Sequence, residues 1–211
     1  RREDRPAWWD VFRLKTLVFV AIAADGAITI LCHRAEMGQG VRTSLPMVVA
    51  DEMEADWGRV TVKQAWAEEA RFGNQDTDGS RSVRHFFVPM RRVGAAARAM
   101  LVSAAASQWN VPESEVQAKN HELIHTPTGK KLGFGDVAQK AAQLEVPSGE
   151  ALKLKSADAF RYIGKGQTHI ADGMDIVTGR AQYGQDVRLD GMLYAVVARP
   201  PVFGGKLVKV D

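Results

Sequence analysis

The sequence predicts an α+β fold, in which a small mixed sheet carries two main helices on one face and a β-rich segment follows. Three observations predict this class: an Asp-Gly turn between two apolar runs, two longer segments with apolar residues at helical spacing, and short β-branched runs after residue 172. We therefore divide the chain into an α+β domain over residues 16–144, a linker over 145–171 and the start of a β-rich domain over 172–211.

The composition is that of an ordinary globular protein. Of the 211 residues, 45% are hydrophobic and 25% are charged, which excludes wholesale disorder and a collagen-like repeat. The net charge is +3 and the basic residues are scattered along the chain, so we predict no nucleic-acid partner. The longest apolar run, over residues 17–24, is too short for a transmembrane helix, which needs about 20 residues, and we predict no such segment.

This apolar run is predicted to pair with residues 28–32 as a β-hairpin, because Asp25-Gly26 between two β-rich runs is a strong turn signal. A cleaved export signal is the alternative, since basic residues precede the run and residues 21–23 mimic a cleavage site. Acidic residues and two tryptophans in the same stretch are untypical of such a signal. We therefore favour the hairpin.

The first main helix is predicted over residues 41–53, where apolar residues repeat at helical spacing. A cap at Thr43 or Ser44 would place Pro46 in the first turn, where proline is tolerated. The residues that follow, 59–66, alternate like a half-buried strand.

A long polar loop over residues 67–80 precedes the second main helix, which we predict from residue 83 to Trp109. Pro89 is expected to kink this helix or to split its first turns from the remainder. A smaller hairpin over 122–132 and a short helix over 134–142 complete the α+β domain.

Beyond residue 172 three short strands are predicted, over residues 181–183, 192–198 and 206–210. Gly and Pro pairs punctuate them. Because three short strands cannot bury much surface alone, we expect the chain to be a fragment or to need a partner.

Side chains suited to catalysis or metal binding are few. His121 and His125 lie four residues apart, but on a predicted strand they do not share a face as helical metal ligands do. The single cysteine, Cys32, lies in an apolar strand without an activating neighbour, and it allows no internal disulfide. We predict neither a catalytic residue nor a metal ligand within this chain.

Two loops are candidates for binding an anion. Met37-Gly-Gln-Gly40 joins a strand to the first main helix, and residues 78–82 lead into the second. The unpaired N–H groups at a helix start carry partial positive charge and suit a phosphate. Gln39 adds an amide that both donates and accepts hydrogen bonds. The plainer interpretation, that each loop is only a turn and a helix cap, stays open.

A specific alternative arises from the same residues. A strand, then Gly38-x-Gly40-x-x-Thr43, then a helix and a second strand resemble a dinucleotide-binding βαβ unit, with Glu68 as the later acidic residue. Thr43 replaces the third glycine of that pattern, and no second βαβ unit follows.

The run from His33 to Trp57, which contains Met37-Gly-Gln-Gly40, resembles the large subunit of molybdenum hydroxylases, the xanthine oxidase family. It is most similar to the branch of isoquinoline 1-oxidoreductase beta subunits and membrane-bound aldehyde dehydrogenases. The loop over residues 78–82 and the helical run over 91–101 are also similar to this branch, as are residues 161–165, 186–199 and 201–205. The resemblance therefore covers about residues 16 to 211.

The resemblance implies a molybdopterin cofactor with molybdenum, commonly in the cytosine dinucleotide form. In such proteins the Met-Gly-Gln-Gly loop contacts the cofactor, which implies that the Gln39 amide lies near the metal–dithiolene end while Gly38 and Gly40 allow the backbone to approach. The loop before the second helix holds the phosphate or pterin region, which implicates Gly79, Ser80 and Ser82. Family members usually have small residues in this loop, whereas this chain has Arg81.

The implied reaction of the whole protein hydroxylates an aldehyde or N-heterocycle with oxygen from water. Electrons pass through molybdenum to iron–sulfur clusters, usually on a separate small subunit. The catalytic glutamate of the family lies outside this chain, and residues 172–211 resemble the opening strands of a hammerhead-like domain. We therefore expect an N-terminal part that is inactive alone, with the remainder of the large subunit and the small subunit as partners.

Other interpretations stay open beside this one. The chain could be a structural or interaction fragment that binds no cofactor, or a nucleotide-binding βαβ unit. The resemblance implies a periplasmic or membrane-associated location, with a cytoplasmic location as the alternative.

Overall fold

The computed structural model describes residues 18–147, 152–166 and 168–209. The residues on which the export-signal alternative depends lie mostly outside these ranges. The chain divides into two compact units after Ala181, and each is described by itself. Within the described ranges, no helix combines the length and the hydropathy of a membrane span.

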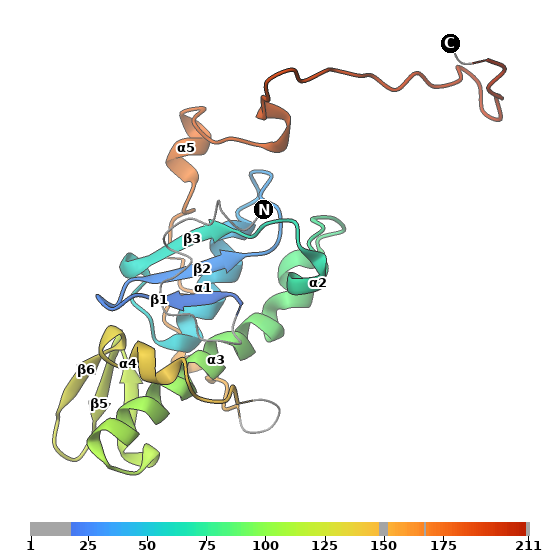
Figure 1. Cartoon of the computed structure of the whole chain (residues 1–211). Coiled ribbons are helices and arrows are strands. Elements are labelled where there is room, and N and C mark those ends of the chain that lie inside the picture. The colour runs from blue at the N-terminus through green and yellow to red at the C-terminus, as the bar shows by residue number, and fades with distance from the viewer. Residues whose placement is uncertain (1–17, 148–151, 167, 210–211) are drawn as a thin grey trace. The chain divides into compact units, whose positions relative to one another are not determined.

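The first sheet is mixed and has three strands, β1 (Val20–Ile22), β2 (Ile28–Cys32) and β3 (Val60–Gln64). Strands β1 and β2 form the predicted hairpin, and Gly26 has a φ of +86° at its turn. Strand β3 pairs with β2 in parallel (Figure 1). Ile28 lies opposite Val60 in this pair. A parallel pair needs a crossover connection, which the first main helix supplies.

This helix, α1 (Val41–Met53), spans the predicted residues, but its cap lies earlier in the chain than the sequence predicted. Its N-cap is Gly40 in the left-handed conformation, so the expected cap at Thr43 or Ser44 is wrong and Pro46 lies beyond the first turn. The physical reason is that the preceding loop supplies the cap, as described below, and the Thr43 hydroxyl instead accepts a hydrogen bond from the backbone N–H of Ala171 at 2.7 Å. A 3₁₀ turn over Trp57–Arg59 leads from α1 to β3.

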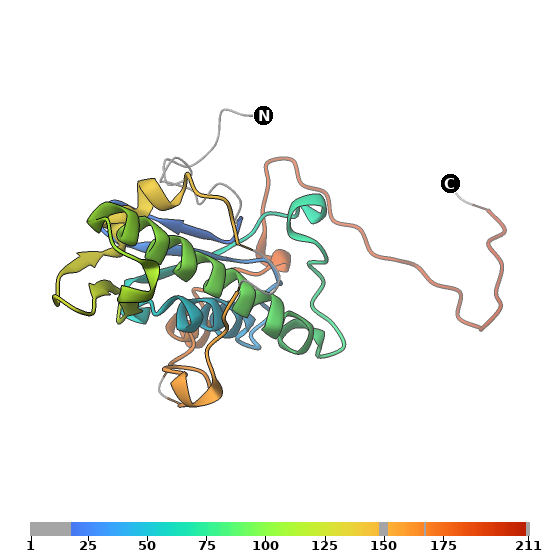
Figure 2. The same ribbon diagram turned by 90° about the horizontal axis from the view of Figure 1, so that it is seen from below.

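The second main helix, α3, runs unbroken over Arg81–Trp109, so it is not split at Pro89. Pro89 is exposed, and the carbonyl that it leaves without an N–H partner can be hydrated. Helix α3 lies beside α1 (Figure 2). The loop predicted over 67–80 contains a short helix, α2 (Glu69–Phe72), that the sequence analysis missed.

A second sheet follows α3. The predicted hairpin is formed by β5 (Glu122–His125) and β6 (Lys131–Gly133), and a further strand that the sequence analysis missed, β4 (Val116–Lys119), pairs with β5. The tight turn between β4 and β5 places His121 in the left-handed conformation. The predicted short helix is α4 (Phe134–Ala141), and its Asp136 carboxylate accepts a hydrogen bond from the Gly133 N–H at 2.7 Å.

One hydrophobic core joins the two sheets, α1, α3 and α4. Its fully buried members include Leu45, Met100, Leu123 and Phe134. This arrangement confirms the α+β class and the mixed sheet that the sequence predicted.

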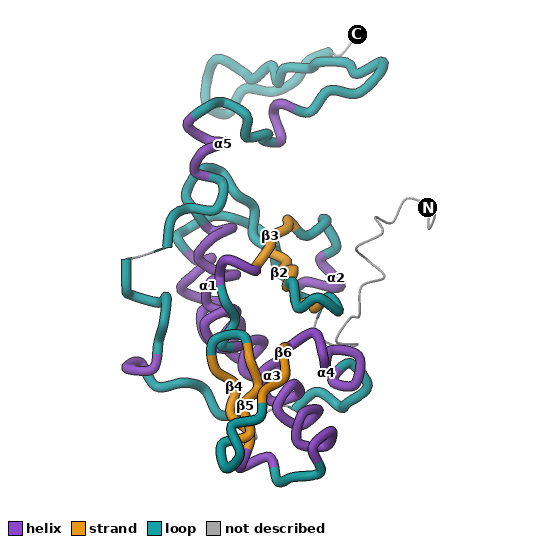
Figure 3. The backbone as a smooth tube through the Cα atoms, turned by 90° about the vertical axis from the view of Figure 1, so that its left-hand side faces the viewer, coloured by secondary structure: helices purple, strands orange, loops and turns teal. Residues whose placement is uncertain are grey.

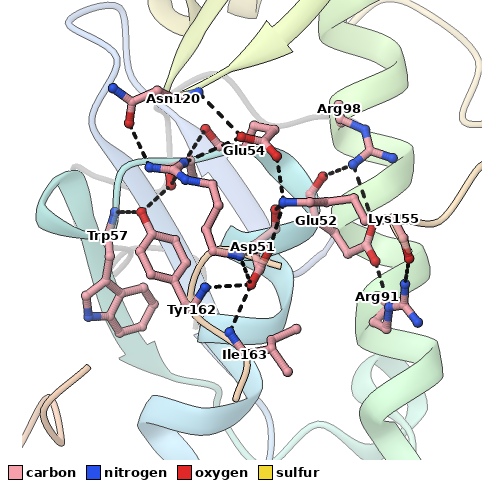
Figure 4. Close-up of polar contacts among 12 residues, drawn as sticks. Asp51, Glu52, Glu54, Trp57, Arg91, Arg98, Asn120, Lys155, Tyr162 and Ile163 are labelled. Atoms are coloured by element: carbon pink, nitrogen blue, oxygen red, sulfur yellow. Dashed lines mark hydrogen bonds and ion pairs between the residues drawn. The ribbon is translucent and has the colours of Figure 1, made fainter. Parts of the chain in front are cut away.

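The described part of the segment predicted as a linker lies against α1 (Figure 4). Asp51 of α1 is completely buried and accepts hydrogen bonds from the backbone N–H groups of residues 161–163 at 2.9–3.3 Å. The Lys155 ammonium lies 2.8 Å from the same carboxylate and 2.5 Å from Glu54. Glu52, also completely buried, pairs with Arg91 and Arg98 of α3.

The β-rich prediction for the C-terminal segment is not met in the residues that the structure describes. Between residues 168 and 209 there is one short helix, α5 (Gly173–Val177), and a 3₁₀ turn over Gly184–Asp186, but no strand (Figure 3). The three expected strands lack neighbours with which to complete a sheet, so their apolar side chains are left outside any core. Leu193 is 92% exposed and Val196 is 96% exposed.

Replacing Gly94 by alanine is expected to destabilise the chain, although alanine ordinarily favours a helix by about 1 kcal/mol. A Cβ atom at Gly94 would lie 2.5 Å from the Val49 carbonyl oxygen of α1, so the two helices would have to separate. We expect a loss of about 1–3 kcal/mol in the free energy of unfolding, measured by urea denaturation. Arg92→Ala, on the exposed side of the same helix, is the control and should change the value little; a stabilised G94A chain would contradict the close packing.

Replacing Asp51 by asparagine is expected to lower the free energy of unfolding by about 3 kcal/mol, because it leaves the Lys155 ammonium without one of its two carboxylates and weakens three backbone contacts. The exposed pair Lys131–Glu122 supplies the control, since Glu122→Gln should cost less than about 1 kcal/mol.

The same variant should alter the acid sensitivity of the fold. Burial raises the pKa of Asp51, but the hydrogen bonds from residue 163, Lys155 and residues 161–162 outweigh it and hold the pKa below its usual range. The stabilisation is therefore complete above the unfolded pKa of about 3.9 and is lost as the pH falls through the lower folded value. Stability curves of the wild type and D51N should converge on acidification; parallel curves would show that Asp51 does not titrate with unfolding.

Candidate functional site

The two candidate loops meet at one pocket. Its volume is about 410 Å³. The first loop and the start of α1 contribute one side, and the loop before α3 with the start of that helix contributes the other. The lining residues are Met37, Gln39, Val41 and Ser44, together with Thr77, Asp78, Gly79, Ser80, Ser82 and Val83. The structure therefore brings together four of the six predicted site residues, while Gly38 and Gly40 lie in the loop behind the lining.

Polar contacts from residues 74–77 to the end of β2 hold the two loops together. The Thr77 hydroxyl donates to the Ala35 carbonyl oxygen at 2.8 Å. The Gln75 amide donates to the His33 carbonyl oxygen at 3.3 Å, and the Arg34 guanidinium donates to the Asn74 carbonyl oxygen at 2.7 Å. The polar loop is thus fixed against the strand end although it contains little regular structure.

The start of α1 already holds a negatively charged group, the Glu36 carboxylate. One Glu36 oxygen accepts hydrogen bonds from the N–H groups of Gly38 and Gly40 at 2.7 and 2.9 Å, and the other accepts from Arg42 N–H at 2.9 Å. Burial raises the pKa of Glu36, but these backbone donors outweigh it and hold the pKa below its ordinary value. A carboxylate of the chain itself therefore occupies the start of α1, where the sequence analysis predicted that a phosphate could bind.

Gln39 closes the same loop with its side chain. Its amide oxygen accepts a hydrogen bond from Met37 N–H at 2.6 Å, and its amide nitrogen donates to the Ala35 carbonyl oxygen at 3.0 Å. The amide is exposed at the pocket and keeps one further N–H and one further lone pair. Gln39 can therefore hold the loop and present a donor and an acceptor at once.

The start of α3 differs from that of α1. Gly79 and Ser80 are both in the left-handed conformation, with φ of +50° and +53°, and the side chain of the N-cap residue Ser80 makes no capping hydrogen bond. The first turn contains no acidic residue, and the Ser82 hydroxyl accepts a hydrogen bond from Arg34 Nε at 3.1 Å. This end of a 29-residue helix lines the pocket with its partial positive charge unopposed by a cap.

Arg81, the residue that departs from the small residues of the resembling family, does not present its charge to the pocket. Its guanidinium makes a two-point contact with the Asp78 carboxylate, at 2.5 and 2.6 Å. The pKa of Asp78 is lowered by this hydrogen bond.

His121, His125 and Cys32 have structural roles. His121 accepts a hydrogen bond from Asp56 N–H at 3.1 Å and contacts the Gly26 carbonyl oxygen at 2.9 Å, while His125 contacts Glu115. Burial raises the pKa of the Cys32 thiol to about 12, so it is not a thiolate nucleophile. In the part of the chain that the structure describes, no group of three His, Cys, Asp or Glu side chains could hold a metal ion.

The sequence analysis missed two residues of this site, Glu36 and Arg34. Glu36 carried a usable signal, because a carboxylate shortly before a helix start is a common partner for its free N–H groups. Nothing in the sequence indicated a role for Arg34, because an arginine next to a strand is expected to be exposed.

Replacing Glu36 by alanine should loosen the loop before α1. It removes the acceptor of three backbone N–H groups, and a hydrogen bond to a charged acceptor contributes about 1.5–3 kcal/mol. We expect amide hydrogen exchange at Gly38, Gly40 and Arg42 to become faster by about tenfold or more. Glu69→Ala, an exposed carboxylate of α2, is the control and should leave these amides unchanged; equal exchange in E36A would contradict the cap.

Comparison with known proteins shows the family of this chain. Residues 8–180 match the molybdopterin cofactor-binding domain. The beta subunit of isoquinoline 1-oxidoreductase from Brevundimonas diminuta is 33% identical over 92% of this chain. A protein of Gluconacetobacter polyoxogenes named membrane-bound aldehyde dehydrogenase [pyrroloquinoline-quinone] is 35% identical, also over 92%. A nicotinate dehydrogenase subunit of Pseudomonas putida is 30% identical over 89%.

These relatives are much longer than the region that they share with this chain. The matches span 29%, 25% and 15% of their respective lengths. The family model, in contrast, matches most of this chain, including both loops of the pocket. The chain therefore belongs to the molybdopterin cofactor-binding domain family, as the resemblance of its Met-Gly-Gln-Gly loop predicted.

Proposed function

We propose that this chain is an N-terminal part of the large subunit of a molybdenum-dependent oxidoreductase, which hydroxylates an aldehyde or N-heterocycle with oxygen from water. The observation that carries the proposal is the pocket in which Gln39 faces the uncapped start of α3. When bound, the molybdopterin cofactor would supply the redox chemistry through its metal. This chain would supply one wall of the site.

The residues at the pocket fit an anionic cofactor. Its volume of about 410 Å³ lies in the range of small-molecule sites, about 300–1,000 Å³. The start of α3 offers partial positive charge, and behind Ser82 the buried Arg34 guanidinium has a nitrogen, Nη2, without a hydrogen-bond partner among the described residues. A polar group of this kind is costly to bury alone, so a negatively charged guest nearby would lower the free energy of the site.

The two loops would have separate tasks. Gly79, Ser80 and Ser82 would hold the phosphate or pterin region, and Gln39 would hydrogen-bond the polar edge near the metal–dithiolene end. Gly38 and Gly40 would let the backbone pass close to the cofactor while their N–H groups stay on Glu36. The cytosine dinucleotide form of the cofactor is the one we propose.

The proposal extends to partners and location. The remainder of the large subunit would complete the pocket and cover apolar side chains such as Leu193 and Val196, and an iron–sulfur small subunit would take up the electrons. Two of the relatives are named as subunits, and the name of another specifies a membrane-bound enzyme. On this basis we propose a periplasmic or membrane-associated protein.

The alternative of a dinucleotide-binding βαβ unit has a real structural counterpart, because β2, α1 and β3 form a parallel βαβ arrangement. In that class of site the pyrophosphate lies on the start of the helix between the strands. Here Glu36 occupies that helix start, so a pyrophosphate there would have to displace a bound carboxylate. The geometry therefore favours the start of α3 as the anion site.

Metal analysis and cofactor extraction from the natural full-length protein test the proposal directly. Molybdenum with a cytidine nucleotide is the expected result. Extraction of pyrroloquinoline quinone, of NAD or of no cofactor would contradict it, and the last outcome would favour a purely structural role.

Replacing Gln39 by alanine in that protein should reduce molybdenum occupancy or turnover by about tenfold or more, because the variant loses the loop contacts to Met37 and Ala35 and the amide at the pocket. Molybdenum content per protein and turnover are the measurements. Gln143→Ala, at an exposed position outside the pocket lining, is the control. Unchanged occupancy and turnover in Q39A would leave Gln39 as a turn residue only.

A further inference from the structure

We propose that Arg34 is a positioning residue for the anion-binding side of the pocket, where its buried guanidinium fixes the start of α3 and supplies a positive charge that forms no ion pair with any described residue. The inference rests on the proposed function, since it takes the pocket to be the site of an anionic cofactor. It assigns to Arg34 no contact with that cofactor.

Among the described residues, the hydrogen bonds of Arg34 all go to neutral acceptors. The residue is completely buried at the end of β2. Its Nε donates to the Ser82 hydroxyl of α3 at 3.1 Å, and Nη1 donates to the carbonyl oxygen of Asn74 at 2.7 Å and also contacts the Asn74 side-chain oxygen. One guanidinium therefore ties the strand end to both the polar loop and the first turn of α3.

The charge of Arg34 is not balanced by any carboxylate within 4.0 Å in the described ranges, and Nη2 has no hydrogen-bond partner there. Other arginines of the chain are paired, such as Arg81 with Asp78 and Arg91 with Glu52. A buried charge without an opposite charge is costly, so its retention calls for a compensating group.

The surroundings of Arg34 supply only part of that compensation. The Phe86 ring lies 5.0 Å from the guanidinium carbon, a cation–π contact. The neighbouring His33 ring packs between Phe19 and Phe86, and both of its nitrogens lack partners among the described residues. Burial lowers the pKa of His33 to about 4, so the ring is neutral near pH 7 and neither adds to the charge nor balances it.

An anion at the start of α3 would complete the electrostatics. Ser82 both lines the pocket and accepts the hydrogen bond from Arg34, so the guanidinium lies one side chain behind the pocket surface. Low polarizability around a buried charge strengthens its effect on a nearby anion. The helix start and the guanidinium thus act in the same direction on the same guest.

A charge exchange between Asn74 and Asp76 tests this inference without altering net charge. These side chains already share a hydrogen bond of 2.7 Å, and neither lines the pocket. In the double variant Asn74→Asp, Asp76→Asn, a carboxylate replaces the neutral acceptor of Arg34 while the 74–76 hydrogen bond can form in the reverse sense. The variant gains an ion pair, so it is expected to fold.

The measurement is the affinity of the full-length protein, freed of cofactor, for inorganic pyrophosphate, by titration calorimetry. We expect the double variant to bind pyrophosphate about tenfold more weakly than the wild type. The carboxylate introduced at position 74 would neutralise the charge of Arg34 on the side away from the pocket. Asp76→Asn alone is the matched control and should not weaken binding. Arg34→Gln should weaken it to a similar extent, and Arg34→Lys should restore most of it. Arg92→Gln, at an exposed position of α3 outside the pocket lining, should stay within about twofold of the wild type.

Several outcomes would overturn the inference: absence of pyrophosphate binding in the wild type, wild-type affinity in the double variant, or equal losses in R34K and R34Q, which would show that only the shape of arginine matters. Cofactor content of the untreated wild-type protein separates this failure from that of the proposed function. Molybdopterin in the wild type together with an unaffected double variant would remove the role of Arg34 alone, whereas absence of molybdopterin would remove the proposed function.

Discussion

Two completely buried carboxylates at the end of α1 hold the main unit together. Asp51 and Glu52 are adjacent in sequence but point to opposite neighbours (Figure 4). Asp51 accepts hydrogen bonds from the backbone of residues 161–163 and pairs with the Lys155 ammonium. Glu52 forms ion pairs with two arginines of α3. A buried carboxylate is stable only when hydrogen bonds or opposite charges satisfy its lone pairs. Each of these two carboxylates therefore holds its partner segments in place.

This constraint also determines which ends of the helices meet. Near its end α1 contacts the middle of α3, where Gly94 allows the Val49 carbonyl oxygen to approach, and Ser44 and Ser82 near the two helix starts line one pocket. The two helices therefore run in the same direction, and their positively polarised ends lie at the same place. Such an arrangement needs negative charge, and Glu36 provides it for α1 alone.

The sequence allowed the prediction of those parts whose signal is local. Periodicity predicted both main helices, and Asp25-Gly26 predicted the first hairpin. It could not predict that Glu36 rather than Thr43 caps α1, because the geometry of the loop decides between two plausible acceptors. Nor could it predict that Asp51 binds a segment 110 residues away, which depends on the tertiary fold alone.

The strands predicted after residue 180 show that a local signal can be present although the structure it predicts does not form. The pattern of β-branched residues is present, but a strand exists only with a neighbour, and the described residues of this segment provide none. The β propensity of this segment therefore indicates that it would form strands if neighbouring strands were available.

The pocket, like these strands, has groups that the described residues leave without a partner. Of two helix starts at one pocket, the first is satisfied by the chain and the second is reinforced by a buried guanidinium and left uncapped. A pocket with both starts satisfied would have little affinity for an anion, and one with both free would be less stable without its ligand, by about 1 kcal/mol, because the two positively polarised helix ends would repel each other. Satisfying one start internally therefore limits this cost while the other start retains its attraction for a cofactor.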